Sequence, residues 1–411
     1  MKIKFIFLNL KIKLNKMNLQ NINFTKYYDE KINEKISNQL STIVNAILEY
    51  KDEFGVISII LTGGFGREEG SVIIKDEKVM PLNDYDIMLV SKKYPHLFNK
   101  AKISLLSMHI SKDITDKIGI TTDILPIFYD KLKKLPNSIF NYETKYGSKI
   151  LWGKNVINEM PNYDAKNIPL FEGIILLFTR IYSLLYGHPK YKPKELVIIQ
   201  STKALHACCE ALLLLSKNYH YSYFERNRIF KNIFFHEFSE IYNKFPQMEE
   251  MVDKAIKFKL YPDYSLFPDS EKLWEETCKI FIFIFKYYFK RYYQINSDNL
   301  GDIIAKFLKE EKRFSLKNPL LWAEYYRSMK LRNKNPNFRL SLFYNPWHFV
   351  SAPLPLVLEM MINDNIHHEK ITNFYLEKLI NMKSNSIDES NYINELRKKC
   401  VIVARNGKFE P

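Results

Sequence analysis

The sequence predicts an α+β protein in which a small mixed sheet flanked by helices comes first and a mainly α-helical region follows. Short runs rich in Val, Ile and Leu, typical of buried strands, lie within residues 56–127. After residues 147–153 the pattern changes to long segments with helical hydrophobic spacing. The 411 residues are enough for two or three domains, each with a substantial core.

Three apolar segments are predicted strands. Residues 56–62 are strongly β-branched, residues 87–90 form a short buried-strand run, and residues 117–127 are a third apolar segment. A helix expected near residues 97–111 joins the second and third strands into a strand-helix-strand unit. Residues 72–80 contain two short apolar runs around a polar turn, which predicts an inserted hairpin.

A glycine-rich segment, GGFGREEG, occupies residues 63–70 directly after the first strand. Glycines at the end of a strand let bare backbone N–H groups approach a phosphate, and Arg67 would add a fixed positive charge. The spacing fits neither the Walker loop nor the G-x-G-x-x-G loops of kinases and dinucleotide-binding proteins. Two structural alternatives remain: Arg67 forms an ion pair with a nearby acid, and Gly66 and Gly70 only permit a positive φ.

Asp84 and Asp86 lie at positions i and i+2 at the beginning of the second predicted strand. Side chains alternate along a strand, so both carboxylates point to one face and Tyr85 points to the other. Two carboxylates on one face can share divalent cations, and their hard oxygen atoms favour Mg²⁺. The structural alternative is a solvated acidic pair at a turn.

A strand, Gly-Gly, and then Asp-x-Asp on the next strand together resemble the nucleotidyltransferase superfamily related to DNA polymerase β. The resemblance covers roughly residues 56–156. It implies that Gly63 and Gly64 contact phosphate and that Asp84 and Asp86 bind metal. Members usually carry a third carboxylate on a neighbouring strand, for which Asp123 is the candidate. The spacing between Gly64 and Asp84 is longer than usual for the superfamily, because of the predicted hairpin.

The resemblance implies a Mg²⁺-dependent enzyme that transfers a nucleoside monophosphate, expected to be AMP from ATP, to an acceptor hydroxyl. Two metal ions are expected at Asp84, Asp86 and Asp123, with a nucleoside triphosphate as donor, and Asp123 is expected to take the proton of the acceptor hydroxyl. The acceptor class stays open among a small molecule, RNA and a protein. The alternative is a catalytically degenerate protein that binds a nucleotide for regulation, and the position of Asp123 discriminates between the two.

The helical region contains three further candidate residues. Lys203 and Glu210 lie seven residues apart, which places them on one face of a predicted helix. Arg226 follows a Tyr-Ser-Tyr stretch that resembles a segment of some transferase-like proteins. We regard these three as candidate acceptor or phosphate contacts, with a packed aromatic corner and a solvated arginine as the alternative for Arg226. His367 and His368 lack the spacing of metal ligands.

These features divide the chain into four predicted regions. They are a flexible N-terminal extension (1–27), a catalytic domain (28–160), an α-helical domain completing the cleft (161–332) and a C-terminal helical and irregular region (333–411). Helices after residue 160 are expected at 170–186, 194–216, 226–244, 248–259, 271–294, 298–311, 319–331 and 367–382.

Composition adds weaker constraints. The formal net charge of +15 is compatible with a polyanionic acceptor such as RNA. Four cysteines without a C-x-x-C pair indicate neither a zinc site nor a disulfide framework, so a reduced cytoplasmic location is expected. The apolar run at 278–285 is shorter than the ~20 residues of a membrane span, which predicts a buried helix and no membrane anchor. The sequence does not specify an oligomeric state.

Overall fold

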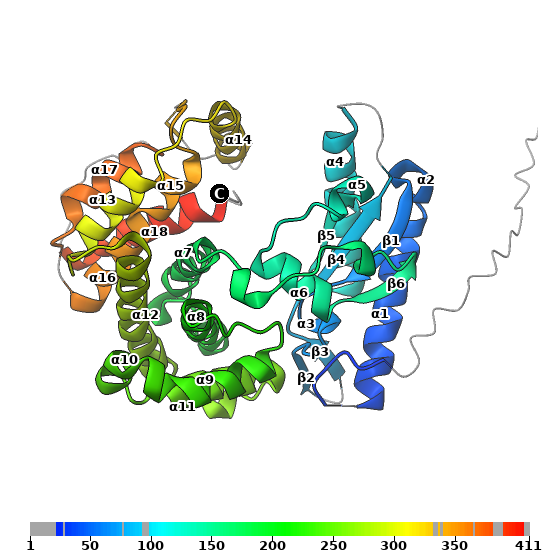
Figure 1. Ribbon diagram of the computed structural model, residues 1–411, viewed down its shortest axis with the longest axis horizontal. Helices are drawn as coiled ribbons and strands as arrows, with labels where there is room; N and C mark the ends of the chain where they lie inside the picture. The colour runs from blue at the N-terminus through cyan, green and yellow to red at the C-terminus, as the bar shows by residue number, and fades with distance from the viewer. Residues whose placement is uncertain are drawn as a thin grey trace, which may run out of the picture. The chain divides into compact units, whose positions relative to one another are not determined.

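The computed structural model describes residues 22–27, 29–75, 78–92, 98–331, 336–337, 340–364, 366–380 and 389–406. The protein is a mixed α+β molecule, 65% helical, with a small mixed sheet and a mainly helical C-terminal region, which confirms the predicted fold class. It divides into two compact units (Figure 1). The first comprises Met1–Tyr163 with Leu260–Pro262, and the second comprises Asp164–Lys259 with Asp263–Pro411.

The first unit is built on a four-stranded sheet with strand order β5-β4-β1-β6. Strands β4 and β5 are parallel and are joined by a helical crossover, whereas β1 is antiparallel to both of its neighbours. A separate antiparallel pair, β2 and β3, confirms the predicted hairpin. The strands are β1 (Val56–Leu61), β2 (Val72–Lys75), β3 (Lys78–Pro81), β4 (Tyr85–Ser91), β5 (Thr122–Phe128) and β6 (Lys149–Gly153).

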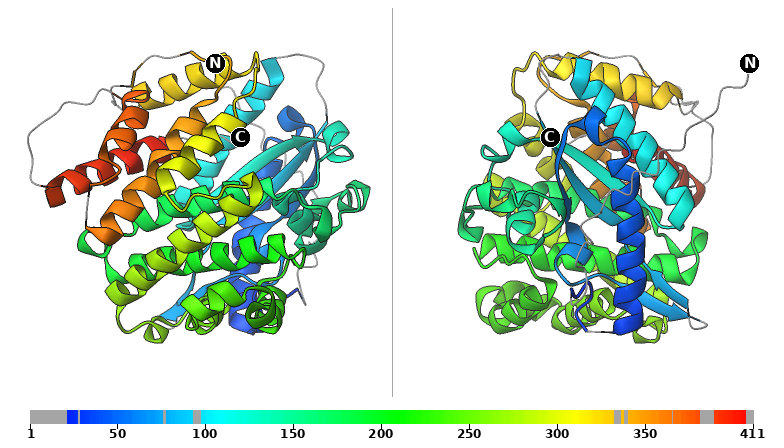
Figure 2. Two further views of the ribbon diagram at one scale, coloured as in Figure 1. Left: turned by 60° about the vertical axis from the view of Figure 1, so that its left-hand side comes forward. Right: turned by 90° about the vertical axis from the view of Figure 1, so that its right-hand side faces the viewer.

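Two long helices, α1 and α4, lie side by side against this sheet, as Figure 2 shows. Apolar side chains from β1 and β4, including Ile59, Leu61, Ile87 and Leu89, are buried in one core with residues of these helices. The helices of this unit are α1 (Glu30–Leu48), α2 (Lys51–Phe54), α3 (Gly63–Gly66), α4 (Phe98–Ile118), α5 (Tyr129–Leu132), α6 (Ile139–Gly147) and the 3₁₀ turn η1 (Ile157–Glu159).

Three expectations for this unit need correction. The third strand begins at Thr122 and not at residue 117, because α4 continues to Ile118 and ends at Gly119, whose φ of 74° suits a left-handed helix end. Strand β6 was not predicted as a strand. Residues 22–27 were assigned to a flexible extension, yet Phe24 is fully buried and its carbonyl accepts a hydrogen bond from Gly70 N–H at 2.9 Å. Residues 1–21 of that extension lie outside the described residues.

The second unit is a helical array around an aromatic core. The ring of Phe178 lies 5.0–5.4 Å from the rings of Phe285, Phe289, Phe307 and Trp347. Its helices are α7 (Phe171–Tyr186), α8 (Lys194–Leu215), α9 (Tyr223–Glu237), α10 (Ser239–Lys244), α11 (Met248–Leu260), α12 (Ser270–Tyr293), α13 (Leu300–Glu310), α14 (Asn318–Leu331), α15 (Pro346–Ser351), α16 (Pro353–Asn363), α17 (Glu369–Glu377) and α18 (Glu389–Asn406). Short 3₁₀ turns are η2 (Ala165–Asn167), η3 (Pro189–Tyr191) and η4 (Tyr264–Leu266).

Most predicted helices of this unit are present, and three regions differ from the prediction. The helix expected at 226–244 begins earlier, where Ser222 caps α9, and is interrupted at Phe238. Helix α16 was not predicted; Pro353 and Pro355 lie in its first turn, where proline is tolerated. The helix expected at 367–382 is α17, which ends at Glu377; residues 381–382 lie outside the described residues.

The apolar run at 278–285 lies within α12, and its apolar side chains are largely buried, as predicted. Among the described residues one helix, α8, is long and apolar enough to cross a membrane, and 78% of its most apolar window is buried inside the structure. Buried core helices of globular proteins have the same composition.

Candidate functional site

The two acidic residues of the Asp-Tyr-Asp segment lie at the start of β4. Tyr85 between them is fully buried, and its hydroxyl donates a hydrogen bond to Gln39 Oε1 of α1 at 2.8 Å. Burial raises the pKa of Tyr85 well above its ordinary value, so the hydroxyl keeps its proton. Because Tyr85 points into the core on the α1 face, strand alternation turns Asp84 and Asp86 to the other face.

Asp123 joins this pair through the register of the parallel strands. Asp86 on β4 is paired directly with Asp123 on β5, and Tyr85 is paired with Thr122. One carboxylate oxygen from each of Asp84, Asp86 and Asp123 lies within 4.8 Å of the other two. Asp84 and Asp123 are exposed and Asp86 is half-buried. The structure therefore brings the three predicted carboxylates into one cluster open to solvent.

The glycine turn lies directly against Asp86. Thr62 donates two hydrogen bonds to the Asp86 carbonyl, from its backbone N–H at 2.8 Å and from its hydroxyl at 3.1 Å. Gly63 follows with a φ of 63°, and a β-carbon at this position would lie 2.0 Å from Asp86 Oδ2. The ring of Phe65, two residues further, packs on Tyr85 with the ring centroids 4.9 Å apart. Gly63 is thus required both for its backbone conformation and for its closeness to the carboxylate.

The positive φ angles that were considered for Gly66 and Gly70 are not observed. A β-carbon at Gly66 would lie 2.5 Å from the carbonyl oxygen of Leu61, and one at Gly70 would lie 2.1 Å from the ring of Phe65. Both glycines are needed because backbone and ring atoms approach them closely, and this packing holds the turn in place.

Arg67 is engaged in ion pairs. Its Nη1 lies 2.6 Å from Glu143 Oε2 on α6, and its Nε lies 3.7 Å from Glu69 Oε2. The side chain is 7% exposed. These contacts match the structural alternative, in which Arg67 ties the glycine turn to α6, and its role in phosphate binding stays a prediction.

Glu210 and Arg226 lie in the helical unit and bind each other. Arg226 is 1% exposed; its Nη1 donates to Glu210 and its Nε and Nη2 donate to the carbonyls of His220 and Tyr221. Its guanidinium also lies 4.5 Å from the ring centroids of Tyr219 and Tyr223. The aromatic corner weighed against a phosphate contact is present, but its arginine is buried in an ion pair and is not solvated as that alternative expected. Lys203 lies half-buried on α8.

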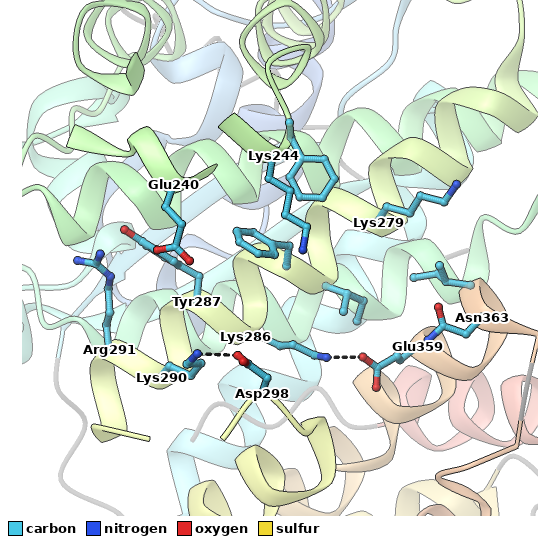
Figure 3. Close-up of a pocket in the computed structure, with 14 residues that line it drawn as sticks. Glu240, Lys244, Lys279, Lys286, Tyr287, Lys290, Arg291, Asp298, Glu359 and Asn363 are labelled. Carbon is cyan, nitrogen blue, oxygen red and sulfur yellow. Dashed lines mark hydrogen bonds and ion pairs between the residues drawn. The ribbon is translucent and has the colours of Figure 1, made fainter. Parts of the chain in front are cut away.

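Sequence reasoning missed a second cluster, formed by Glu359, His367 and His368, whose ligand atoms also lie within 4.8 Å of one another. The two histidines are adjacent in the sequence, and the third ligand comes from α16, so no spacing rule indicates them. Glu359 also lines a cavity of about 860 Å³ in the helical unit, shown in Figure 3. Its acidic and basic lining residues are Glu240, Lys244, Lys279, Lys286, Lys290, Arg291, Asp298 and Glu359.

The carboxylate cluster and the glycine turn have complementary chemistry. Three carboxylates within reach of one another offer the hard oxygen atoms that Mg²⁺ and Ca²⁺ accept, and their mutual repulsion is relieved when a cation binds. The first N–H groups of a helical turn have no intrahelical acceptor, so the turn at Gly63 offers donors next to the carboxylates. Searches of protein-family models, curated proteins and solved structures found no match to the chain.

Proposed function

We propose that the protein is a metal-dependent nucleotidyltransferase that transfers a nucleoside monophosphate, expected to be AMP from ATP, to an acceptor hydroxyl. The observation that carries this proposal is the convergence of Asp84, Asp86 and Asp123 within 4.8 Å, directly beside the turn at Gly63. The order of strand, Gly-Gly, and Asp-x-Asp, which resembles the nucleotidyltransferase superfamily, supports the same function.

The residues have separate roles in this proposal. Asp84 and Asp86 would hold the metal ion that accompanies the triphosphate, and Asp123 would help to hold a second ion. When bound, the ions neutralise charge on the attacking and departing oxygen atoms. Asp123, which is exposed, accepts the proton of the acceptor hydroxyl. The acceptor oxygen forms a bond to the α-phosphorus, the bond to the bridging oxygen breaks, and pyrophosphate departs.

Positioning depends on the surrounding structure. The Asp86 backbone is fixed by two hydrogen bonds from Thr62, and its carboxylate lies against Gly63. Tyr85 fixes the same strand from the other face through Gln39. Because the strand backbone at Asp86 is fixed before a cation binds, this ligand is positioned in advance, which is what a preorganised centre requires.

A transfer assay tests this function. Purified protein with Mg²⁺ is given ATP, CTP, GTP or UTP labelled at the α-phosphate, and total RNA, a small-molecule extract and the protein itself are offered as acceptors. We expect label transfer with one preferred nucleotide, and at least about a hundredfold loss in the Asp84→Asn/Asp86→Asn variant, because the metal ligands are lost.

The matched control is Asp113→Asn, which removes an exposed carboxylate on α4 that faces His109 at 3.3 Å. Its transfer rate should equal that of the parent. Nucleotide binding without transfer to any of the three acceptors would contradict the enzyme proposal and favour a regulatory nucleotide-binding protein. Transfer that persists in the double variant would show that the carboxylates are not the centre.

A further inference from the structure

The second cluster of ligating side chains lies where α16 ends and α17 begins. Glu359 Oε2 lies 2.7 Å from His368 Nε2 and 3.5 Å from His367 Nε2. Both imidazoles therefore turn the same ring nitrogen toward a single carboxylate oxygen. The rings themselves lie 3.8 Å apart. Two adjacent histidines and a glutamate from another helix are thus gathered around one point.

This donor set is that of a zinc-type centre. Two imidazole nitrogens and one carboxylate oxygen are the protein ligands of His₂Glu zinc sites, in which the fourth position holds water or a substrate atom. Zinc lies roughly 2.0–2.2 Å from such ligands, so an ion placed between the three atoms needs only small side-chain rotations to reach them. Nitrogen ligands disfavour Mg²⁺ and Ca²⁺, which separates this cluster from the carboxylate centre of the first unit.

The surroundings orient the ligands. Glu359 and His368 are buried, with 7% and 5% exposure, whereas His367 is 40% exposed. Lys286 donates to the other carboxylate oxygen, Glu359 Oε1, at 2.5 Å, as Figure 3 shows. A hydrogen bond to the second oxygen of a ligating carboxylate fixes its orientation and is typical of metal sites. The exposed His367 gives an ion access from solvent.

We propose that Glu359, His367 and His368 form a binding site for a zinc-class divalent transition metal, independent of the carboxylate centre. The bound ion would join α16 to the start of α17 and so stabilise this part of the helical unit. The competing structural role is an ion-pair network in which Glu359 is satisfied by Lys286 and His368 alone.

Zinc titration of the full-length protein tests the proposal. Protein freed of metal with a chelator is used in the Asp84→Asn/Asp86→Asn/Asp123→Asn background, so that the carboxylate centre cannot contribute. We expect one Zn²⁺ ion per chain by calorimetry, no heat with Mg²⁺, and with Co²⁺ the intense visible absorption of a tetrahedral centre. Zinc should also raise the melting temperature.

Matched variants identify the ligands. His367→Ala removes an exposed side chain, so it should leave the fold intact while weakening Zn²⁺ affinity by about tenfold or more. His109→Ala removes an exposed histidine beside a carboxylate in the other unit and should change nothing. Glu359→Gln is a second test, because it retains the shape of the side chain and removes its charge. The proposal is overturned if the parent binds no Zn²⁺, or if neither His367→Ala nor Glu359→Gln weakens its binding.

Discussion

Gly63 and Asp86 lie so close together that there is no room for a side chain at position 63 unless the Asp86 carboxylate moves. A β-carbon at Gly63 would lie 2.0 Å from Asp86 Oδ2, and the residue has a φ of 63°. The sequence indicated that glycine belongs here for phosphate access. The structure adds that the missing side chain makes room for a proposed metal ligand.

Gly63→Ala should weaken divalent-metal binding by displacing the Asp86 carboxylate. Gly119→Ala is the matched control, because Gly119 also has a positive φ, of 74°, but a β-carbon there meets no atom within 4 Å. Both variants should lose about 1 kcal/mol of unfolding free energy through backbone strain. Only Gly63→Ala should reduce Mn²⁺ affinity, by about tenfold or more in a binding titration. Equal effects on affinity would show that Asp86 does not depend on this contact.

Local spacing predicted part of the residue-scale site and could not predict the rest. The i, i+2 rule placed Asp84 and Asp86 on one face, and buried Tyr85 faces away as expected. Asp123 was suggested only by the family resemblance. It lies near Asp86, which is 37 residues earlier in the sequence, because of the register of the parallel strands β4 and β5, and local spacing does not reveal that register. The ion pair between Arg67 and Glu143 of α6 could not be predicted from the sequence either. Contacts between distant elements have no signal in local spacing.

At the scale of elements, β4 is fixed to α1 through Tyr85 and Gln39. Tyr85→Phe removes a buried hydroxyl and leaves Gln39 Oε1 without this 2.8 Å hydrogen bond. We expect a loss of about 1–3 kcal/mol of unfolding free energy, measured by urea denaturation, because a buried acceptor loses its donor. The Gln39→Leu/Tyr85→Phe double variant should recover part of this loss. A single variant as stable as the parent would show that this bond contributes nothing.

The ion pair between Arg226 and Glu210 joins α9 to α8 in the same way. Arg226→Met should cost about 3–5 kcal/mol, because it leaves the Glu210 carboxylate buried without its cation. Glu210→Leu combined with Arg226→Met should restore much of the stability. Nucleotide affinity should be unchanged in the double variant, as measured by titration with ATP and Mg²⁺. A large loss of affinity in that folded variant would instead favour the phosphate contact suggested from the sequence.

The ends of several helices are set by single capping or turn residues, which the apolar pattern alone did not reveal. Gly119 ended α4 inside a run that was predicted to be strand, and Ser222 started α9 before its predicted beginning. Pro353 and Pro355 lie in the first turn of α16. The missed strand β6 is five residues long and pairs with the distant β1, so its own sequence gave little indication.

At the scale of the whole molecule, buried neutral histidines link stability to pH. Burial lowers the pKa of His206 to about 3 and that of His348 to about 4, and partial burial lowers that of the half-buried His188 to about 4. An unfolded histidine titrates near ~6.5, so the folded state binds fewer protons between these values. The stability from neutral burial is therefore complete above about pH 6.5 and is lost as the pH falls toward 4.

The buried His206 and His348 should each reduce the unfolding free energy by up to about 1.4 kcal/mol per pH unit below about pH 6, and the half-buried His188 should reduce it by less. Thermal melts from pH 7.5 to 5 should show the decline. His206→Gln keeps a donor toward the backbone of Ala255 but does not titrate, so its melting temperature should fall less steeply than that of the parent. The exposed-histidine variant His109→Ala should follow the parent. If the melting temperatures of His206→Gln and the parent fall equally between pH 7.5 and 5, the buried histidine does not link stability to pH.

The central claim is that the carboxylate centre directs attack at the α-phosphorus of a nucleoside triphosphate. Parallel reactions with ATP labelled at the α- or the γ-phosphate, using the acceptor fraction active in the transfer assay, test it most directly. We predict that α-label enters the acceptor, that γ-label departs as pyrophosphate, and that Asp123→Asn abolishes both. Transfer of γ-label to the acceptor would instead indicate a phosphotransferase, and transfer of α-label that survives Asp123→Asn would remove Asp123 from the centre.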